Sequence, residues 1–486
     1  MTSFSSKNKC IWNMAASEIR LIHLDLKGAP LKVDFLEKLF PVLAAWGATG
    51  LLVEWEDTFP YFGRLAGVGS LASSTPVYSE NDVRQIHNLA VENNLSVVPL
   101  VQTFGHFEFV LKHSEWRELR EIPNYPSSLC PSHPLSLPLV TEMLDQIIQL
   151  SPAARHVHIG ADEVWHLGLC SLCSARSKEK TFLSHLTAVL SHLRSRHPHI
   201  RPIMWDDMLR AIDQSVLDEF KIGELVEPMV WHYQTAQSFS LSKEMWHKYS
   251  QVFPRIWLAS AYKGATGSCQ LLPVVSHHVS NHQQWLVTHE QLNDKFQQIC
   301  GIAFTGWSRY DHFATLCELL PPSLPSLALC IRVWLSRQFS DEVLQSVSKQ
   351  LGYADNTFPL NPYPRPQPIP QELTFPGWKV AVGVEWLANL RTKQNHILNS
   401  DQVQTWLNPW QIANNFTNPM QIESLHSVFK EMEQEWHSLE RYLRQHLPEV
   451  YYERAVEEWV GTLVTPSTRR LCDIAESTSR QLQLHS

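Results

Sequence analysis

Two adjacent carboxylates, Asp162 and Glu163, stand in the stretch HVHIGADEVWHLG at 156–168. The stretch opens with alternating polar and apolar residues, as a strand does, and passes through Gly160 and Ala161 into the two acids. Small residues followed by acids at a strand end predict a site where a ligand comes close to the backbone. Adjacent side chains of an extended chain point in diverging directions. We therefore expect the two acids to address different atoms of one substrate and not to share one proton.

The elements that position these acids are eight short apolar segments, which we expect to be strands. They lie at 21–26, 50–55, 95–106, 156–160, 201–207, 228–233, 255–262 and 301–307. Between them, amphipathic patterns predict helices at 33–46, 136–150 and 178–196, and a further helix that starts from a Ser79 cap. Eight βα units in about this length predict an α/β chain, a (β/α)8 TIM barrel followed by a C-terminal helical region.

Four segments are predicted along the 486 residues: an N-terminal extension (1–17), the barrel (18–350), a Pro-rich linker (351–376) and a helical C-terminal region (377–486). The run PLNPYPRPQPIP cannot form a helix or an inner strand. The last segment carries apolar residues at three-to-four spacing. We expect its helices to pack on the barrel or to form a homodimer contact, and a separate binding module is the alternative.

Acids, histidine and aromatic residues recur at the carboxyl ends of the predicted strands, where TIM barrels build their sites. Aromatic side chains stack against sugar faces, and acids bind hydroxyls or transfer protons. An ordinary glycosidase takes two carboxylates from separated positions. Adjacent acids suit another scheme, in which one protonates the leaving oxygen and the other steers a nucleophile on the substrate. The acids, histidine and aromatic residues at the ends of the predicted strands are Asp25, Glu54, Glu56, Asp57, His106, Asp162, Glu163, Trp205, Asp206, Asp207, Trp231, Tyr262 and Trp307.

The motif HIGADEVW resembles the His-x-Gly-Gly-Asp-Glu signature of glycoside hydrolase family 20, the β-N-acetylhexosaminidases, with Ala161 in place of the second Gly. QTFGH at 102–106 is similar to the family's Asp-Thr-Pro-Gly-His, and EDTFPY at 56–61 is similar to its acidic Phe-Pro-Tyr segment. The resemblance covers 18–337 and extends more weakly through the C-terminal helices. The barrel segments LDLKGAP, LVQTFGHFEFVLKH, LVEP, ASAYKGATG and TGWSRYDH resemble a branch without a signal peptide that works in the cytoplasm and nucleus.

The resemblance implies an exo-acting hydrolase that removes terminal β-linked GalNAc or GlcNAc from a glycoconjugate or oligosaccharide, with retention and without a cofactor. In this family the 2-acetamido oxygen of the substrate attacks the anomeric carbon and forms an oxazolinium ion. Glu163 matches the general acid/base. Asp162 matches the residue that orients the acetamide and balances the developing positive charge.

The resemblance also implies a set of substrate-binding residues. Tyr262 matches the tyrosine that bonds the acetamide oxygen, three tryptophans match the wall around the sugar, and Arg20 matches the arginine for the outer hydroxyls. The acid on the strand of Trp205 is Asp206 or Asp207. The family often has a carboxylate two residues after the last tryptophan, where this chain has Arg309, so the choice between galacto and gluco substrates stays open. The set is Arg20, His106, Trp205, Asp206, Trp231, Tyr262, Trp307 and Asp311.

Two other functions stay open: a related enzyme that removes GlcNAc from proteins, and a catalytically silent carbohydrate-binding barrel. A silent barrel is expected to have lost Asp162 or Glu163, and both remain. The His-x-His at 156–158 imitates a metal site, but apart from His106 no matching histidines stand at other strand ends. Cys170 and Cys173 form Cys-x-x-Cys without a second pair at zinc-finger spacing. The sequence therefore predicts ordinary thiols and no metal.

Composition restricts partners and compartment. A net charge of −8 gives no basic face for nucleic acid. No apolar run approaches the length of a membrane span, and the N-terminal residues contain none of signal-peptide length. The nine cysteines are scattered and odd in number, as in a chain with reduced thiols. We expect a cytoplasmic and nuclear protein without a nucleic-acid or membrane partner.

Overall fold

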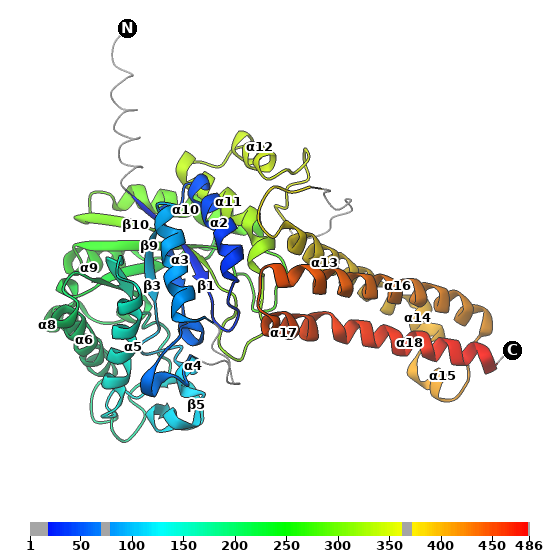
Figure 1. Ribbon diagram of the computed structural model, residues 1–486, viewed down its shortest axis with the longest axis horizontal. Helices are drawn as coiled ribbons and strands as arrows, with labels where there is room; N and C mark the ends of the chain where they lie inside the picture. The colour runs from blue at the N-terminus through cyan, green and yellow to red at the C-terminus, as the bar shows by residue number, and fades with distance from the viewer. Residues whose placement is uncertain (1–17, 70–77, 362–371, 485–486) are drawn as a thin grey trace, which may run out of the picture.

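The computed structural model describes residues 18–69, 78–361 and 372–484. Parallel strands close into an eight-stranded barrel in the order β1-β10-β9-β8-β7-β6-β3-β2 (Figure 1). The strands are β1 (Ile19–Asp25), β2 (Gly50–Glu54), β3 (Ser96–Leu100), β6 (His156–His158), β7 (Arg201–Trp205), β8 (Glu227–Trp231), β9 (Arg255–Lys263) and β10 (Gln298–Gly306). The predicted TIM barrel is confirmed, and each of its strands overlaps a segment expected to form one.

Helices surround the barrel and connect its strands. The longer ones are α2 (Val33–Trp46), α3 (Glu80–Glu92), α5 (Ser136–Leu150), α6 (Lys178–Arg196), α9 (Lys243–Val252), α10 (Val275–Leu292) and α11 (Leu320–Ser336). Shorter ones are α4 (Glu108–Leu111), α7 (Asp207–Arg210) and α8 (Gln214–Glu219). Ser79 caps α3 as predicted, because its hydroxyl accepts a hydrogen bond from the Asp82 backbone N–H while the Asp82 carboxylate accepts one from the Ser79 backbone N–H.

The alternation of side chains along the strands separates two apolar cores. One fills the inside of the barrel and includes Leu52, Ile203 and Trp205. The other lies between the strands and the helices and includes Val53, Met204 and Tyr262. Trp205 and Tyr262, which the sequence placed in one site, therefore belong to opposite faces of the barrel wall.

Two long loops stand over the carboxyl end of the barrel. The loop after β3 carries an antiparallel hairpin, β4 (Arg120–Ile122) and β5 (Tyr125–Leu129), which the sequence did not predict. The loop after β6 runs from 159 to 177 and begins with the acidic motif. The two loops touch, since the backbone N–H groups of Leu169 and Cys170 both donate to the Glu121 carboxylate of the hairpin, at 2.6 and 3.0 Å.

The C-terminal region is helical, as predicted. After α12 (Asp341–Gln350) it contains α13 (Trp378–Leu398), α14 (Asp401–Trp406), α15 (Pro409–Ala413), α16 (Pro419–His446), α17 (Glu453–Leu463) and α18 (Thr465–Leu484). Helices α13, α16 and α18 pack together and extend away from the barrel (Figure 1). Phe429 and Trp436 of α16 are fully buried and belong to the same continuous apolar core that lies between the barrel strands and helices. Within the described ranges, no helix has both the length and the apolar character needed to cross a membrane.

The predicted extension at 1–17 lies outside the described residues, and so do residues 362–371 of the Pro-rich segment. On either side of that gap, Tyr353, Leu373 and Phe375 are buried against the core. The division of the chain into four segments stays a prediction.

The segment between α16 and α17 joins the C-terminal helices to the barrel. Val450 accepts a backbone hydrogen bond from Lys32 at 2.8 Å, and Tyr451 pairs with Leu31. The Tyr451 hydroxyl accepts a hydrogen bond from the Leu320 backbone N–H at 3.0 Å. Leu320 begins α11, whose N-terminus has no side-chain cap from its own N-cap residue. The first N–H groups of a helix lack partners within the helix, so Tyr451 supplies one from a distant part of the chain.

We predict that Tyr451→Phe lowers the melting temperature of the chain by a few degrees. The substitution keeps the ring but leaves the buried Leu320 N–H without an acceptor, which costs about 1–3 kcal/mol. Thermal unfolding followed by circular dichroism measures the effect. Tyr125→Phe is the matched control, because Tyr125 is 52% exposed. Equal melting temperatures for Tyr451→Phe and wild type would contradict this account of the junction.

Candidate active site

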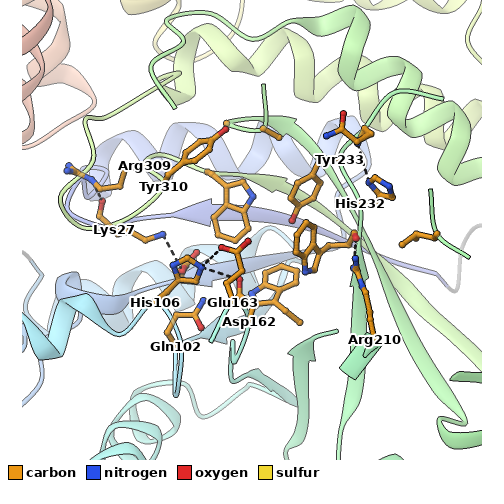
Figure 2. Close-up of a pocket in the computed structure, with 18 of the residues that line it drawn as sticks. Lys27, Gln102, His106, Asp162, Glu163, Arg210, His232, Tyr233, Arg309 and Tyr310 are labelled. Atoms are coloured by element: carbon orange, nitrogen blue, oxygen red, sulfur yellow. Dashed lines mark hydrogen bonds and ion pairs between the residues drawn. The ribbon is translucent and has the colours of Figure 1, made fainter. Parts of the chain in front are cut away.

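A cavity of about 470 Å³ opens at the carboxyl ends of the barrel strands (Figure 2). This end of the barrel and this size are typical of small-ligand sites in the fold. Six residues predicted from the sequence line the cavity: His106, Asp162, Glu163, Trp205, Trp231 and Trp307. Its other lining residues include Lys27, Glu54, Gln102, Arg210, Tyr233, Arg309 and Tyr310.

The backbone of the acidic motif turns sharply as it leaves β6. Gly160, Ala161 and Glu163 have φ values of 64°, 67° and 46°, in the left-handed region. A side chain at Gly160 would come within 1.9 Å of the Gln102 amide oxygen, and one at Gly105 within 2.0 Å of the Asp162 carbonyl oxygen. Ala161 adopts a conformation that costs a non-glycine residue about 1–2 kcal/mol. Strain of this kind persists only where the surrounding contacts impose it, which is common at functional sites.

Asp162 is almost completely buried and is fixed by one neighbour. The Gln102 side chain donates to Asp162 Oδ1 at 2.9 Å, and its oxygen accepts from the Ala161 backbone N–H at 3.1 Å. Burial raises the pKa of Asp162, although the positive charge of His106 and the hydrogen bond from Gln102 oppose the shift. Gln102 thus sets both the backbone and the carboxylate of this acid.

One ring nitrogen of His106 faces both acids from the same side (Figure 2). Its Nε2 is 3.1 Å from Glu163 Oε2 and 3.6 Å from Asp162 Oδ2. Burial disfavours the charged ring, but the charge of Asp162 and the hydrogen bond to Glu163 outweigh it and raise the pKa of His106 to about 10. The imidazole is therefore a cation at neutral pH and donates to Glu163.

The sequence left open which acid after Trp205 belongs to the site. Neither Asp206 nor Asp207 lines the cavity, but their contacts differ. Asp207 accepts from the Glu163 backbone N–H at 2.9 Å and from Trp231 Nε1 at 3.3 Å. Burial and the charge of Asp162 raise the pKa of Asp207 to about 7. The predicted residue, Asp206, is fully buried outside the cavity. It accepts two hydrogen bonds from Arg210, at 2.6 and 2.8 Å, and so orients a residue that lines the cavity.

Aromatic rings form much of the remaining wall. The ring centroids of Trp205 and Trp307 are 5.8 Å apart, and Trp231 stacks on Tyr233 at 5.2 Å with an interplanar angle of 24°. Lys27 extends the wall, with its ammonium group 5.4 Å from the centroid of Trp307. Flat apolar faces beside polar groups suit the faces and hydroxyls of a sugar ring.

The expected position of Arg20 is corrected by the structure. Arg20 lies near the start of β1, at the opposite end of the barrel from the cavity. Its guanidinium donates to the backbone oxygens of Gly47 and Glu18, at 2.7 and 2.8 Å. Arg20 was assigned to the site because it stands five residues before Asp25. Strand β1 spans the height of the barrel, however, so the two residues lie at opposite ends of it.

Tyr262 and Asp311 are likewise not brought to the cavity. Tyr262 is fully buried on the outer face of β9, where its hydroxyl donates to the His23 backbone oxygen at 3.3 Å. The Asp311 carboxylate accepts from the backbone N–H groups of Phe313 and Ala314, at 2.7 and 2.9 Å, and so shapes its own loop. His158, expected to be structural, is fully buried, and its Nδ1 accepts from the Gly160 backbone N–H at 3.0 Å.

The cavity residues that were not selected from the sequence include Tyr233, Lys27 and Arg210. Tyr233 follows Trp231 by two residues and therefore shares its face, a signal that the strand pattern contained. Lys27 Nζ lies 3.6 Å from both Asp25 Oδ2 and Glu54 Oε1. Arg210 lies one helical turn beyond Asp206, the spacing at which side chains meet.

Comparison with known proteins agrees with this architecture. Residues 8–312 match the catalytic domain of glycosyl hydrolase family 20. Hexosaminidase D of Homo sapiens is 38% identical over 465 residues, covering 93% of both chains. Hexosaminidase D of Bos taurus is 45% identical over 341 residues, covering 69% of this chain and 97% of that protein.

Solved structures of low identity share the fold. A β-N-acetylhexosaminidase from Bacteroides fragilis superposes with a TM-score of 0.51 at 14% identity, covering 71% of this chain and 75% of that chain. The chitobiase of Flavobacterium johnsoniae gives 0.50 at 14% identity, covering 96% and 72%. The family match and the relatives confirm the resemblance found in the sequence: this chain belongs to glycosyl hydrolase family 20 and is a glycoside hydrolase.

Proposed function

We propose that the chain is an exo-acting β-N-acetylhexosaminidase that removes terminal β-linked GalNAc or GlcNAc from a glycoconjugate, with retention of configuration. The observation that carries the proposal is the arrangement of two adjacent acids with different surroundings. Asp162 is buried and fixed by Gln102, whereas the Glu163 side chain is 35% exposed at the cavity and bonded to His106. Such different surroundings fit two separate roles in one reaction.

In the first step, the 2-acetamido oxygen of the substrate attacks the anomeric carbon and the glycosidic C–O bond breaks. Glu163 gives a proton to the leaving oxygen, and an oxazolinium ion remains. In the second step, water adds to the anomeric carbon and gives its proton to Glu163, and the acetamide is restored. Two inversions at the anomeric carbon give overall retention.

Asp162 orients the acetamide N–H and balances the positive charge of the oxazolinium ion. A buried carboxylate acts strongly on a charge that develops beside it, because little water screens the interaction. Its hydrogen bond with Gln102 at 2.9 Å restrains the carboxylate before the substrate arrives. The carboxylate then needs no reorganisation as the ion forms.

His106 holds the proton that the first step uses. An imidazolium that donates to Glu163 Oε2 at 3.1 Å forms a pair with one shared proton. As the leaving oxygen gains negative charge, the proton passes from the pair through Glu163 to that oxygen. Removal of His106 also removes a positive charge that lowers the pKa of Asp162.

Tyr233 takes the role that the sequence assigned to Tyr262, a hydrogen bond to the acetamide oxygen. It lines the cavity and stacks on Trp231, whereas Tyr262 faces away from the cavity. Lys27 takes the place of Arg20 as the cation for the outer hydroxyls, since it lines the cavity beside Trp307.

We predict that the chain hydrolyses aryl β-GalNAc or β-GlcNAc and leaves aryl β-galactoside and β-glucoside intact. The two latter sugars lack the acetamide that supplies the nucleophile. Release of the aryl alcohol measures turnover for all four substrates. In Glu163→Gln, turnover with poor leaving groups should fall by about 10²–10⁴, which assigns the activity to this site. Equal rates with and without the acetamide would exclude substrate assistance.

We predict that His106→Gln moves the acid limb of the kcat/KM profile to higher pH. Asp162 must be ionised to balance the oxazolinium charge, and loss of the His106 cation raises its pKa further. On lowering the pH, the variant therefore loses activity before the wild type does. Steady-state rates across the pH range measure the shift. His396→Gln on the exposed surface of α13 is the control, and a His106→Gln profile that coincides with the wild type would refute the coupling.

We predict opposite effects for the two tyrosines. Tyr233→Phe should lower kcat by about 10²–10³, as loss of one preorganised donor does. Tyr262→Phe should leave kcat within a few-fold of wild type and lower the melting temperature, because it removes only the bond to His23. Kinetics on the aryl substrate and thermal unfolding separate the two outcomes. A large kcat loss confined to Tyr262→Phe would return the role to the residue that sequence resemblance named.

A further inference from the structure

Three cysteines from the loops after β3 and β6 lie close together outside the cavity. Cys130 directly follows β5 in the loop after β3, and Cys170 and Cys173 lie in the loop after β6. Cys130 Sγ is 3.5 Å from Cys170 Sγ and 3.6 Å from Cys173 Sγ. With a carboxylate oxygen of Glu121 from β4, one ligand atom from each residue lies within 4.8 Å of all the others.

The sulfur separations distinguish a metal site from a disulfide. A disulfide holds its sulfurs about 2.0 Å apart. Two Zn–S bonds of about 2.3 Å at a tetrahedral angle hold sulfurs about 3.8 Å apart. The observed 3.5 and 3.6 Å are close to the tetrahedral value for both pairs that share Cys130.

The surroundings of the Glu121 carboxylate are a second, independent observation that points to a bound cation. Glu121 is 1% exposed. Its Oε1 accepts from the backbone N–H groups of Leu169 and Cys170, at 2.6 and 3.0 Å. Its Oε2 is buried and has no hydrogen-bond partner among the described residues. An unpaired buried carboxylate oxygen is costly, and a cation within the cluster would satisfy it.

We propose that Glu121, Cys130, Cys170 and Cys173 bind one Zn²⁺ ion in a closed structural site. Thiolates with a carboxylate in four-coordinate, tetrahedral geometry suit Zn²⁺, and a site without an open position is structural and not catalytic. Each thiol releases its proton to solvent as its bond to the metal forms. The Ser132 hydroxyl, 3.1 Å from Cys173 Sγ, donates to that thiolate in the loaded site.

The ion ties together the two loops that carry the reacting groups. His106 precedes Cys130 in the loop after β3, and Asp162 and Glu163 precede Cys170 in the loop after β6. A bond between the loops would hold the His106–Glu163 separation, which no barrel strand fixes directly. The site does not rest on the hydrolytic mechanism proposed above, and its residues do not line the cavity.

We predict that the full-length chain, purified without chelator, contains one zinc per chain by mass spectrometry of its metals. Cys170→Ser and Glu121→Gln should lower that content and the melting temperature. Cys269→Ser and Glu118→Gln are matched controls, because both residues are exposed outside the cluster and should leave the zinc content unchanged. A strong chelator should lower the melting temperature of the wild type, and added Zn²⁺ should restore it.

A second measurement covers variants that fail to fold. Exchange of the wild-type metal for Co²⁺ should give the absorption of tetrahedral Co²⁺ bound to thiolates. Wild-type chain that folds and turns over substrate without stoichiometric metal would overturn the proposal. So would a Cys130–Cys170 or Cys130–Cys173 disulfide found by peptide mapping of alkylated, unreduced chain. Iron with inorganic sulfide in place of zinc would overturn it as well, since such clusters normally take four cysteines.

Discussion

The carboxyl end of this barrel depends on one electrostatic arrangement, a histidine cation that faces two adjacent carboxylates. Burial makes a charged Asp162 costly, and a second acid beside it adds repulsion. His106, at 3.1 Å from one acid and 3.6 Å from the other, offsets both effects. The strained turn through Gly160 and Ala161 places the two acids beside that cation. On the loop after β3, Gly105 lets the backbone pass close to the Asp162 carbonyl oxygen, and the loop brings His106 to the acids.

The barrel itself supplies little of this arrangement directly. Strands β3 and β6 end at Leu100 and His158, and the candidate site residues His106, Asp162 and Glu163 stand beyond those ends, on loops. Loops have few backbone hydrogen bonds of their own, so side chains must fix them. Gln102 bridges the two loops beside the acids, and the Cys–Glu cluster bridges them again further out. The precision of the site thus rests on contacts between loops more than on the sheet.

The sequence predicted the barrel because its periodicity is local: each strand and helix is visible in its own segment. It also predicted that Glu163, His106 and Trp205 line the cavity, since position at a strand end is enough to place them. It failed where the outcome depends on the face or on a distant partner. Tyr262 turns to the outer core, whereas Ala259 of the same strand packs inside the barrel. Cys130 joins the Cys-x-x-Cys pair from 40 residues away, a convergence that spacing cannot reveal.

Arg309, which stands where the family often has a carboxylate, connects the cavity to the C-terminal helices. Its guanidinium is bound by Glu458 of α17 at 3.0 and 3.1 Å, the bidentate geometry that fixes arginine most firmly. It also donates to the backbone oxygens of Lys27 and Ala314. Because its donors are bound to loop carbonyl oxygens and to Glu458, Arg309 forms part of the cavity wall and joins that wall to α17. Lys27 and Tyr310 also line the cavity. Under the proposed function, they offer a cation and a phenol to the sugar hydroxyls at this edge.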